Sequence, residues 1–209
     1  MGNLKTILDE SANLLTKQPF DDAHDLSHHE RVWENAQKIA GQIPEKLNRD
    51  ALHVAVMWHD VMVGDEKLLN KRHKNIGLIL NRLQLLMSEN GFDSNFQKIV
   101  TEAIKHHEFG SKKQVNIEGK VLFDADKLDA LNPTRYRKII NAIKSKKISK
   151  LQTFLYVQAA KLWLRTMRSR YHFEISKQMH DKLVAQLLQD KEAIDLGNEL
   201  GVDIAKLAR

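Results

Sequence analysis

Apolar residues recur every three or four positions along most of this chain, which is the spacing of amphipathic helices. One such segment carries Val32, Ala36 and Ile39 on a single stripe and stops near Gly41. Only 3 prolines and 9 glycines interrupt the sequence, and they fall between the periodic segments. The pattern therefore predicts an all-α fold.

The segment that follows Asn48 is the most apolar of the chain. Asn48 is a favourable N-cap residue, and residues 51 to 58 contain almost no charge. Because a helix that is apolar on most sides is buried in a globular protein, we expect this segment to form the central helix.

The remaining pattern predicts further helices and one long connection. Helices are expected over Lys71 to Asn90, after Asp93 or Ser94, and around 151–167, 173–188 and 194–207. A polar loop is expected from Phe109 to Gly119, and a helix that begins near Asp126 follows it. A length of 209 residues suits one domain over the whole chain.

Most of the ten histidines fall at the ends of these predicted helices. On the central helix, three or four residues beyond the buried Ala55 and Val56 lie His59 and Asp60, so both side chains are expected to point inward. A buried carboxylate beside an imidazole is costly unless a cation neutralises it, and a divalent metal can use both groups as ligands.

Other polar side chains are predicted to converge on the same place. Counting back from Val32 and Ala36 puts His28 on the inner face, although helical spacing alone does not choose among His24, His28 and His29. Ala103 and Ile104 likewise place His107, together with His106, toward the core. Asp126 follows three apolar residues and is the acidic group most expected to lie inside.

Composition narrows the chemistry and the partners. The absence of cysteine excludes disulfides and thiolate ligands, so a metal must be bound through nitrogen and oxygen. A formal charge of +6 and a pI of about 9.4 favour anionic partners. The basic stretch 135–150 lacks interleaved aromatic rings, so we interpret it as a solvated face and expect no nucleic-acid partner.

The sequence has no apolar run that resembles a signal peptide or a membrane span. The cytoplasm is therefore the expected location, and no membrane partner is expected.

Three segments resemble, in order, the H…HD…D signature of the HD superfamily of metal-dependent phosphohydrolases. They are His24 to Val32, Trp58 to Val61 and Phe123 to Ala130. The resemblance covers about residues 20–135, and the Arg31-Val32 context selects His28 among the three candidate histidines. It implies that His28, His59, Asp60 and Asp126 are the metal ligands and that Asp60 is catalytic.

The resemblance also implies a fold and an activity. The expected fold is a single-domain antiparallel helical bundle of the HD-domain type. Beyond residue 135 the expectation depends on periodicity alone, and we expect the helices of 136–209 to pack on the motif-bearing part. The expected activity is hydrolysis of a nucleotide or another small phosphoester by a water that the metal activates. Nitrogen and oxygen ligands suit Mn, Fe, Co, Ni, Zn or Mg ions.

A second resemblance concerns the HD-type cyclic dinucleotide phosphodiesterases. His73 to Gly77 and His106 to Glu108 are similar to the additional histidine motifs of that family, and they imply a second metal held by His73, His106 and His107. The Gly-Tyr-Pro signature of that family is absent, because Phe109, Gly110 and Ser111 follow Glu108.

Some roles and alternatives stay open at this stage. Arg31 and Lys127 are candidates to hold a substrate phosphate, and Asp129 is a candidate to orient a metal ligand. The alternative functions are an HD-type di-iron oxygenase and a non-catalytic nucleotide-binding HD module.

Overall fold

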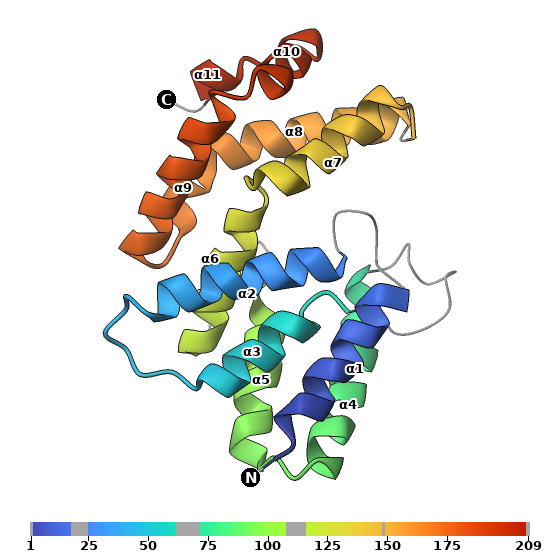
Figure 1. Ribbon diagram of the computed structural model, residues 1–209, viewed down its shortest axis with the longest axis vertical. Coiled ribbons are helices and arrows are strands. Elements are labelled where there is room, and N and C mark those ends of the chain that lie inside the picture. The colour runs from blue at the N-terminus through green and yellow to red at the C-terminus, as the bar shows by residue number, and fades with distance from the viewer. Residues whose placement is uncertain (1, 18–24, 62–71, 108–115, 148, 208–209) are drawn as a thin grey trace. The chain divides into compact units, whose positions relative to one another are not determined.

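The computed structural model describes residues 1–209 except 1, 18–24, 62–71, 108–115, 148 and 208–209, and it does not describe the side chains of 72–75 and 207. Within the described part, every regular element is helical (Figure 1), so the predicted all-α class is confirmed. The helices gather in two compact units, residues 1–125 and 126–209. The expectation that the whole chain forms one domain stays a prediction.

The first unit is built around one helix. Its elements are α1 (Leu4–Lys17), α2 (Leu26–Ala40), α3 (Arg49–Trp58), α4 (Arg72–Glu89), α5 (Ser94–His106) and most of α6 (Ile117–Asp129). Helix α3 packs against α1, α2 and α5, and Figure 1 shows its cyan ribbon lying between α2 and α1. The central position predicted for this segment is therefore confirmed.

Local sequence explains why α3 forms and where it lies. The Asn48 side chain accepts the Ala51 N–H at 3.0 Å, which satisfies one of the first free donors of the helix. Seven of its ten residues are buried. At its last residue, the Trp58 indole N–H donates to the Ile7 carbonyl of α1 at 3.1 Å, so the end of α3 is fixed by both packing and a hydrogen bond.

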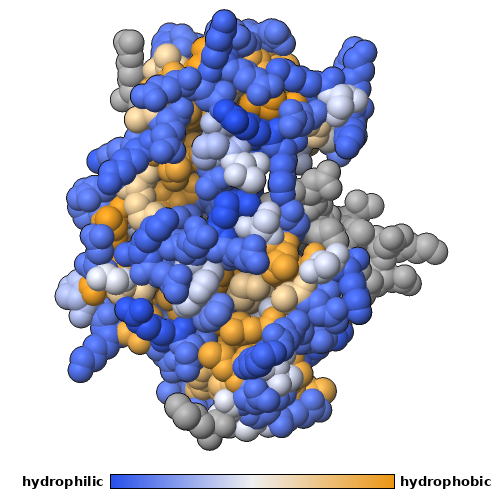
Figure 2. All heavy atoms as spheres, viewed as in Figure 1, coloured by the Kyte–Doolittle hydropathy of each residue, from blue (hydrophilic) through white to orange (hydrophobic). Residues whose placement is uncertain are grey.

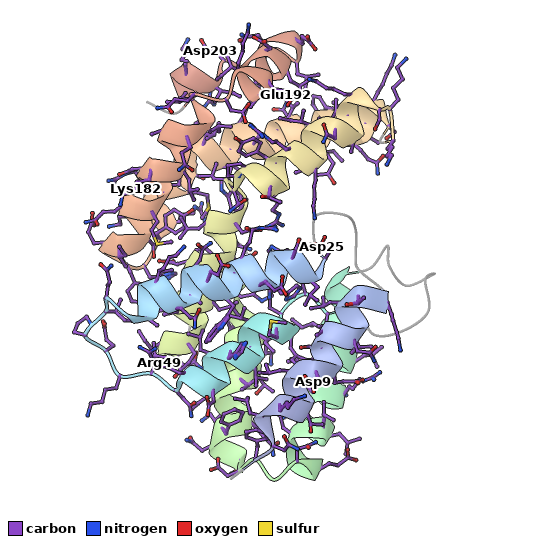
Figure 3. All side chains as sticks on the ribbon, viewed as in Figure 1. Asp9, Asp25, Arg49, Lys182, Glu192 and Asp203 are labelled. Carbon is purple, nitrogen blue, oxygen red and sulfur yellow. The ribbon has the colours of Figure 1, made fainter. Side chains whose placement is uncertain are left out.

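Helices α2 and α5 begin at aspartate N-caps. The Asp25 carboxylate, labelled in Figure 3 at the start of α2, accepts the His28 N–H at 3.1 Å. The Asp93 carboxylate accepts the Phe96 N–H at 2.8 Å, as the sequence predicted for Asp93 or Ser94. Each carboxylate also interacts favourably with the positive end of its helix.

Helix α6 begins earlier than the sequence predicted. The expected loop end at Gly119 and the expected helix start near Asp126 are wrong, because the helix runs over Ile117–Asp129. Residues 109–115 of the predicted loop lie outside the described residues. The Asn116 side chain accepts the Gly119 N–H at 2.8 Å, which is an N-cap contact. Glu118 in the first turn accepts the Asn48 N–H at 2.7 Å. Asp126 therefore lies in the last turn of α6, not in its first.

The second unit contains the rest of the chain. Its elements are the end of α6, α7 (Pro133–Lys144), α8 (Lys150–Thr166), the short 3₁₀ helix η2 (Arg168–Arg170), α9 (Glu174–Leu187), α10 (Lys191–Glu199) and α11 (Ile204–Leu207). The helix predicted over 194–207 is divided in two, because Gly201 has a φ of +70°, a conformation that ends helices.

The core of the second unit is a small cluster: Leu131, Ile140, Val184, Leu187, Ala193 and Leu196. Hydrophobic side chains also reach the surface of this unit, and Figure 2 shows orange patches in the part of the view where α8 and α9 lie. Among the described helices none is long and apolar enough to cross a membrane.

Candidate metal centre

The end of α3 carries the first two residues of the site. His59 and Asp60 follow the buried turn of the helix and are 4% and 6% exposed. The His59 Nδ1–H donates to the Val56 carbonyl at 2.7 Å, one of the last carbonyls of a helix, which lack a partner within the helix. This bond orients the ring and leaves the His59 Nε2 as the lone-pair atom, 3.6 Å from the Asp60 carboxylate.

His28 reaches the same point from α2. Its ring is fully buried, and its backbone N–H is held by the Asp25 cap. The His28 Nε2 lies 3.3 Å from the His59 Nε2 and 4.0 Å from an Asp60 oxygen. The structure therefore brings together three of the residues predicted as metal ligands: His28, His59 and Asp60.

His107, which directly follows α5, is a further member of this cluster. It is 1% exposed, and its Nδ1–H donates to the Ile104 carbonyl at 2.5 Å. Its Nε2 lies 3.8 Å from the other oxygen of Asp60. His59 and His107 thus have the same arrangement, in which Nδ1 binds a backbone carbonyl and Nε2 faces the carboxylate.

The geometry of these atoms fits a divalent cation. Two ligand atoms about 2.1 Å from one ion, at the angles of tetrahedral or octahedral sites, lie about 3.0–3.4 Å apart, and the two Nε2 atoms of His28 and His59 lie 3.3 Å apart. Three imidazoles and one carboxylate with almost no solvent contact are the donors that Zn, Fe, Mn, Co or Ni ions accept. We therefore describe the cluster as a candidate metal centre.

Asp126 is the first residue of the second unit. Its side chain is buried, and its carboxylate pairs with the Lys127 ammonium at 2.5 Å. Its assignment as the fourth ligand stays a prediction. Lys127 is itself only 8% exposed, so both partners of this ion pair are buried.

Asp129, predicted to orient a metal ligand, is fully buried. The guanidinium of Arg135 lies 3.5 Å from the Asp129 carboxylate and 3.8 Å from that of Asp126. Arg135 belongs to the basic stretch 135–150, which the sequence predicts to be a solvated face, so its pairing with two buried acids was not predicted. The acids in Asp126-Lys127-Leu128-Asp129, spaced three apart on a helix, were the available signal.

The other predicted site residues lie on α5, α2 and α4. His106 is the last residue of α5 and is half-buried. Arg31 is half-buried on α2 and donates to the Ser27 hydroxyl at 3.1 Å. His73 falls in the first turn of α4, and its side chain lies outside the described residues. The second metal site therefore stays a prediction.

His29 is a buried member of the histidine cluster that the sequence did not assign. Its Nδ1 bonds the Val56 carbonyl at 2.9 Å, the same oxygen that orients His59. Burial first, and then the neighbouring rings of His59 and His28, hold the pKa of His29 well below its usual value. His29 is therefore neutral near pH 7 and supports the rings around it by packing.

Fold and site together define an all-helical protein with a buried histidine and aspartate cluster. The HD domain family model matches residues 25–131, just over half of the 209-residue chain. The chain therefore belongs to the HD domain family, and the recognition made from its motifs is confirmed.

A solved structure supports the same fold. A predicted HD superfamily hydrolase from an uncultured Thermotogales bacterium is similar to this chain with a TM-score of 0.58 and 23% sequence identity. The match covers 90% of this chain and 94% of that one. No curated protein matches the chain.

Proposed function

We propose that this protein is a metal-dependent phosphohydrolase that acts on a nucleotide or another small phosphoester. The observation that carries the proposal is the 3.3 Å approach of the His28 and His59 Nε2 atoms beside the buried Asp60 carboxylate. Membership of the HD domain family and the similarity to a predicted HD superfamily hydrolase support the reaction class.

Each residue of the cluster has a distinct part in the proposal. His28, His59 and Asp60 hold the cation, and His107 is placed to bind or to hydrogen-bond at the same centre. The Val56 and Ile104 carbonyls keep the rings of His59 and His107 in one tautomer. A divalent ion held there lowers the pKa of a coordinated water and offsets negative charge on a phosphoryl group.

We further assign Asp126 to the ligand set. The HD domain match includes this residue, and it lies on α6, the helix whose Gly119 packs closely on Ala103 of α5. Asp60, as the carboxylate among the histidines, is the catalytic residue of the proposal. Arg31 and Lys127 are proposed to bind the substrate phosphate.

The test combines metal analysis with a screen for phosphate release. We expect about one divalent ion or more for each purified chain, and release of phosphate from nucleotides or sugar phosphates with at least one of the Mn, Fe, Co, Ni, Zn and Mg ions. Asp60→Ala should lose the metal and at least about a thousandfold in rate, because the centre then lacks its carboxylate.

Asp50→Ala is the matched control, since Asp50 is an exposed aspartate in the first turn of the same helix α3. It should keep both metal and activity. Failure of every phosphoester with every metal would contradict the proposal. A coloured protein that consumes oxygen would favour the di-iron oxygenase, and tight nucleotide binding without turnover would favour the binding module.

A further inference from the structure

Helix α8 of the second unit has many apolar side chains, but none of its residues is fully buried. Ten of its 17 residues are hydrophobic, yet none of the 17 is buried. Leu151, Phe154, Leu155 and Leu162 are 67%, 58%, 56% and 53% exposed. An apolar helix that lies on the outside of a unit marks an interaction surface more often than a stable solvated face.

The exposed leucines form one narrow seam. Leu151, Leu155, Gln158 and Leu162 follow the alternating spacing of four, three and four residues that places side chains on the inner edge of a paired helix. The other side of α8, which includes Trp163, lines an apolar cavity of about 260 Å³ with residues of α7, α10 and α11. The seam is therefore the side that faces away from its own unit.

Charge indicates what kind of partner fits this seam. Residues 130–173 contain eleven Lys and Arg and no Asp or Glu, whereas the whole chain has 33 of the former and 27 of the latter. The rest of the chain is thus net acidic, and all of its excess positive charge lies in this segment. By helical spacing, Lys161 and Arg165 lie on the same edge of the seam as Phe154.

We propose that α8 pairs with an acidic amphipathic helix of another protein. Leucines of the partner would pack on Leu151, Leu155 and Leu162, and its flanking carboxylates would face Lys161 and Arg165. A second copy of this chain fits poorly, because α8 carries Lys150, Lys161 and Arg165 and no acidic residue that could pair with them.

Two other classes of partner fit the seam less well. A lipid surface would bury the Gln158 amide among acyl chains, where it has no hydrogen-bonding partner, whereas a helix can supply one. A nucleic acid would use the positive charge but not the three leucines, because its contacts are to phosphates and to stacked aromatic rings.

The experiment uses the full chain and two synthetic helical peptides. One peptide carries leucines at the same alternating spacing with glutamates on both flanks, and the other has lysine in place of every glutamate. Fluorescence anisotropy should give at least about a tenfold tighter Kd for the glutamate peptide, and high salt should weaken its binding. Phosphatidylserine vesicles and a DNA duplex are titrated in parallel.

Variants with matched controls locate the interaction. Leu155→Gln combined with Leu162→Gln should weaken the glutamate peptide by about tenfold or more, and Lys161→Glu by about threefold or more. Leu85→Gln on α4, where the leucine is 61% exposed, and Lys182→Glu on α9, labelled in Figure 3, should leave its Kd unchanged.

The variants lie on the surface, and their circular dichroism spectra and melting temperatures should match those of the wild-type chain. Equal binding of the two peptides, or unchanged binding by the double leucine variant, would overturn the proposal. Tighter binding of the vesicles or of the duplex than of the glutamate peptide would also overturn it, in favour of a membrane or a nucleic acid. Phosphate release does not enter this test, so the two proposals fail independently.

Discussion

The cores of the two units differ in how completely they are closed. In the first unit, Leu52, Val54 and Trp58 of α3 have no exposed surface. In the second unit, Leu128 and Met167 are also fully buried, but every member of the cluster around Leu131 keeps between 4% and 8% of its surface exposed, and a cavity of about 260 Å³ lies beside it. A closed core transmits small changes in volume to its surroundings, whereas a loose one absorbs them.

This difference agrees with the proposed role of each unit. Three imidazoles and a carboxylate can share one ion only if their positions are held closely, and α3 supplies His59 and Asp60 from the closed core. The second unit instead exposes α8 to solvent, although ten of the 17 residues of this helix are hydrophobic. The burial of the two helices differs because α3, which begins after Asn48, packs against three other helices, whereas α8, which begins after Ser149, is covered on a single side.

The largest expected effect comes from truncation in the closed core. Leu52→Ala on α3 should lower the free energy of unfolding by about 3–5 kcal/mol, because the packed neighbours cannot fill the space. Leu196→Ala beside the cavity of the second unit should cost about 2 kcal/mol, the lower end for such a change. Urea unfolding followed by tryptophan fluorescence measures both.

The tryptophans separate the two units in this measurement. Trp33 and Trp58 lie in the first unit and Trp163 in the second, so a Trp163→Phe background reports on the first unit alone. Equal losses for the two leucine variants would contradict the difference between the cores.

The next largest expected effect concerns a hydrogen bond between the start of α3 and the first turn of α6. Glu118 is 4% exposed, and its carboxylate accepts the Asn48 N–H at the start of α3. Glu118→Ala should therefore cost about 1–3 kcal/mol, because a hydrogen bond from the Asn48 N–H to a buried charged group is lost. Glu45→Ala, at an exposed position, is the control and should change stability little. A Glu118→Ala loss no larger than that of the control would show that the contact contributes nothing.

This contact also illustrates what the sequence could not predict. The α3 cap at Asn48 and the inward direction of His59 and Asp60 follow from local patterns, and both were predicted. The start of α6 was missed because Asn116 acts as a cap within a segment that looks like a polar loop, and because Glu118 bonds a residue 70 positions away. Contacts between distant segments leave no mark in local spacing.

The residues of the candidate metal centre could likewise be predicted from the sequence only in part. Helical spacing placed His28 and His107 inward but could not separate them from His29 and His106. Packing made that separation, because His107 directly follows the last residue of α5 and its Nδ1 reaches the Ile104 carbonyl. His29 is buried too, although it bonds Val56 instead of facing Asp60.

The smallest expected effect concerns a polar contact of the second unit. The Tyr136 hydroxyl of α7 donates to the Asp190 carboxylate at 2.7 Å, and the Arg137 guanidinium donates to the same oxygen at 2.8 Å. Burial and this carboxylate raise the pKa of Tyr136 to about 12, and the Tyr136 hydrogen bond is the main cause that lowers the pKa of Asp190. Tyr136→Phe should cost about 1 kcal/mol near pH 7.

The pKa shifts of Asp190 and Tyr136 predict how this difference in stability changes with pH. The pKa of Asp190 is lower in the folded state than in the unfolded state. The carboxylate therefore stabilises the fold at pH values above its unfolded pKa of about 3.9, and this stabilisation is lost as the pH falls through the lower folded pKa. The stability difference between Tyr136→Phe and the wild type should therefore shrink below about pH 4. At the alkaline end, the Tyr136 contribution should be lost as pH rises from about 10 through its folded pKa of about 12. A difference that stays constant from acid to alkaline pH in urea unfolding would mean that Tyr136 acts by packing alone.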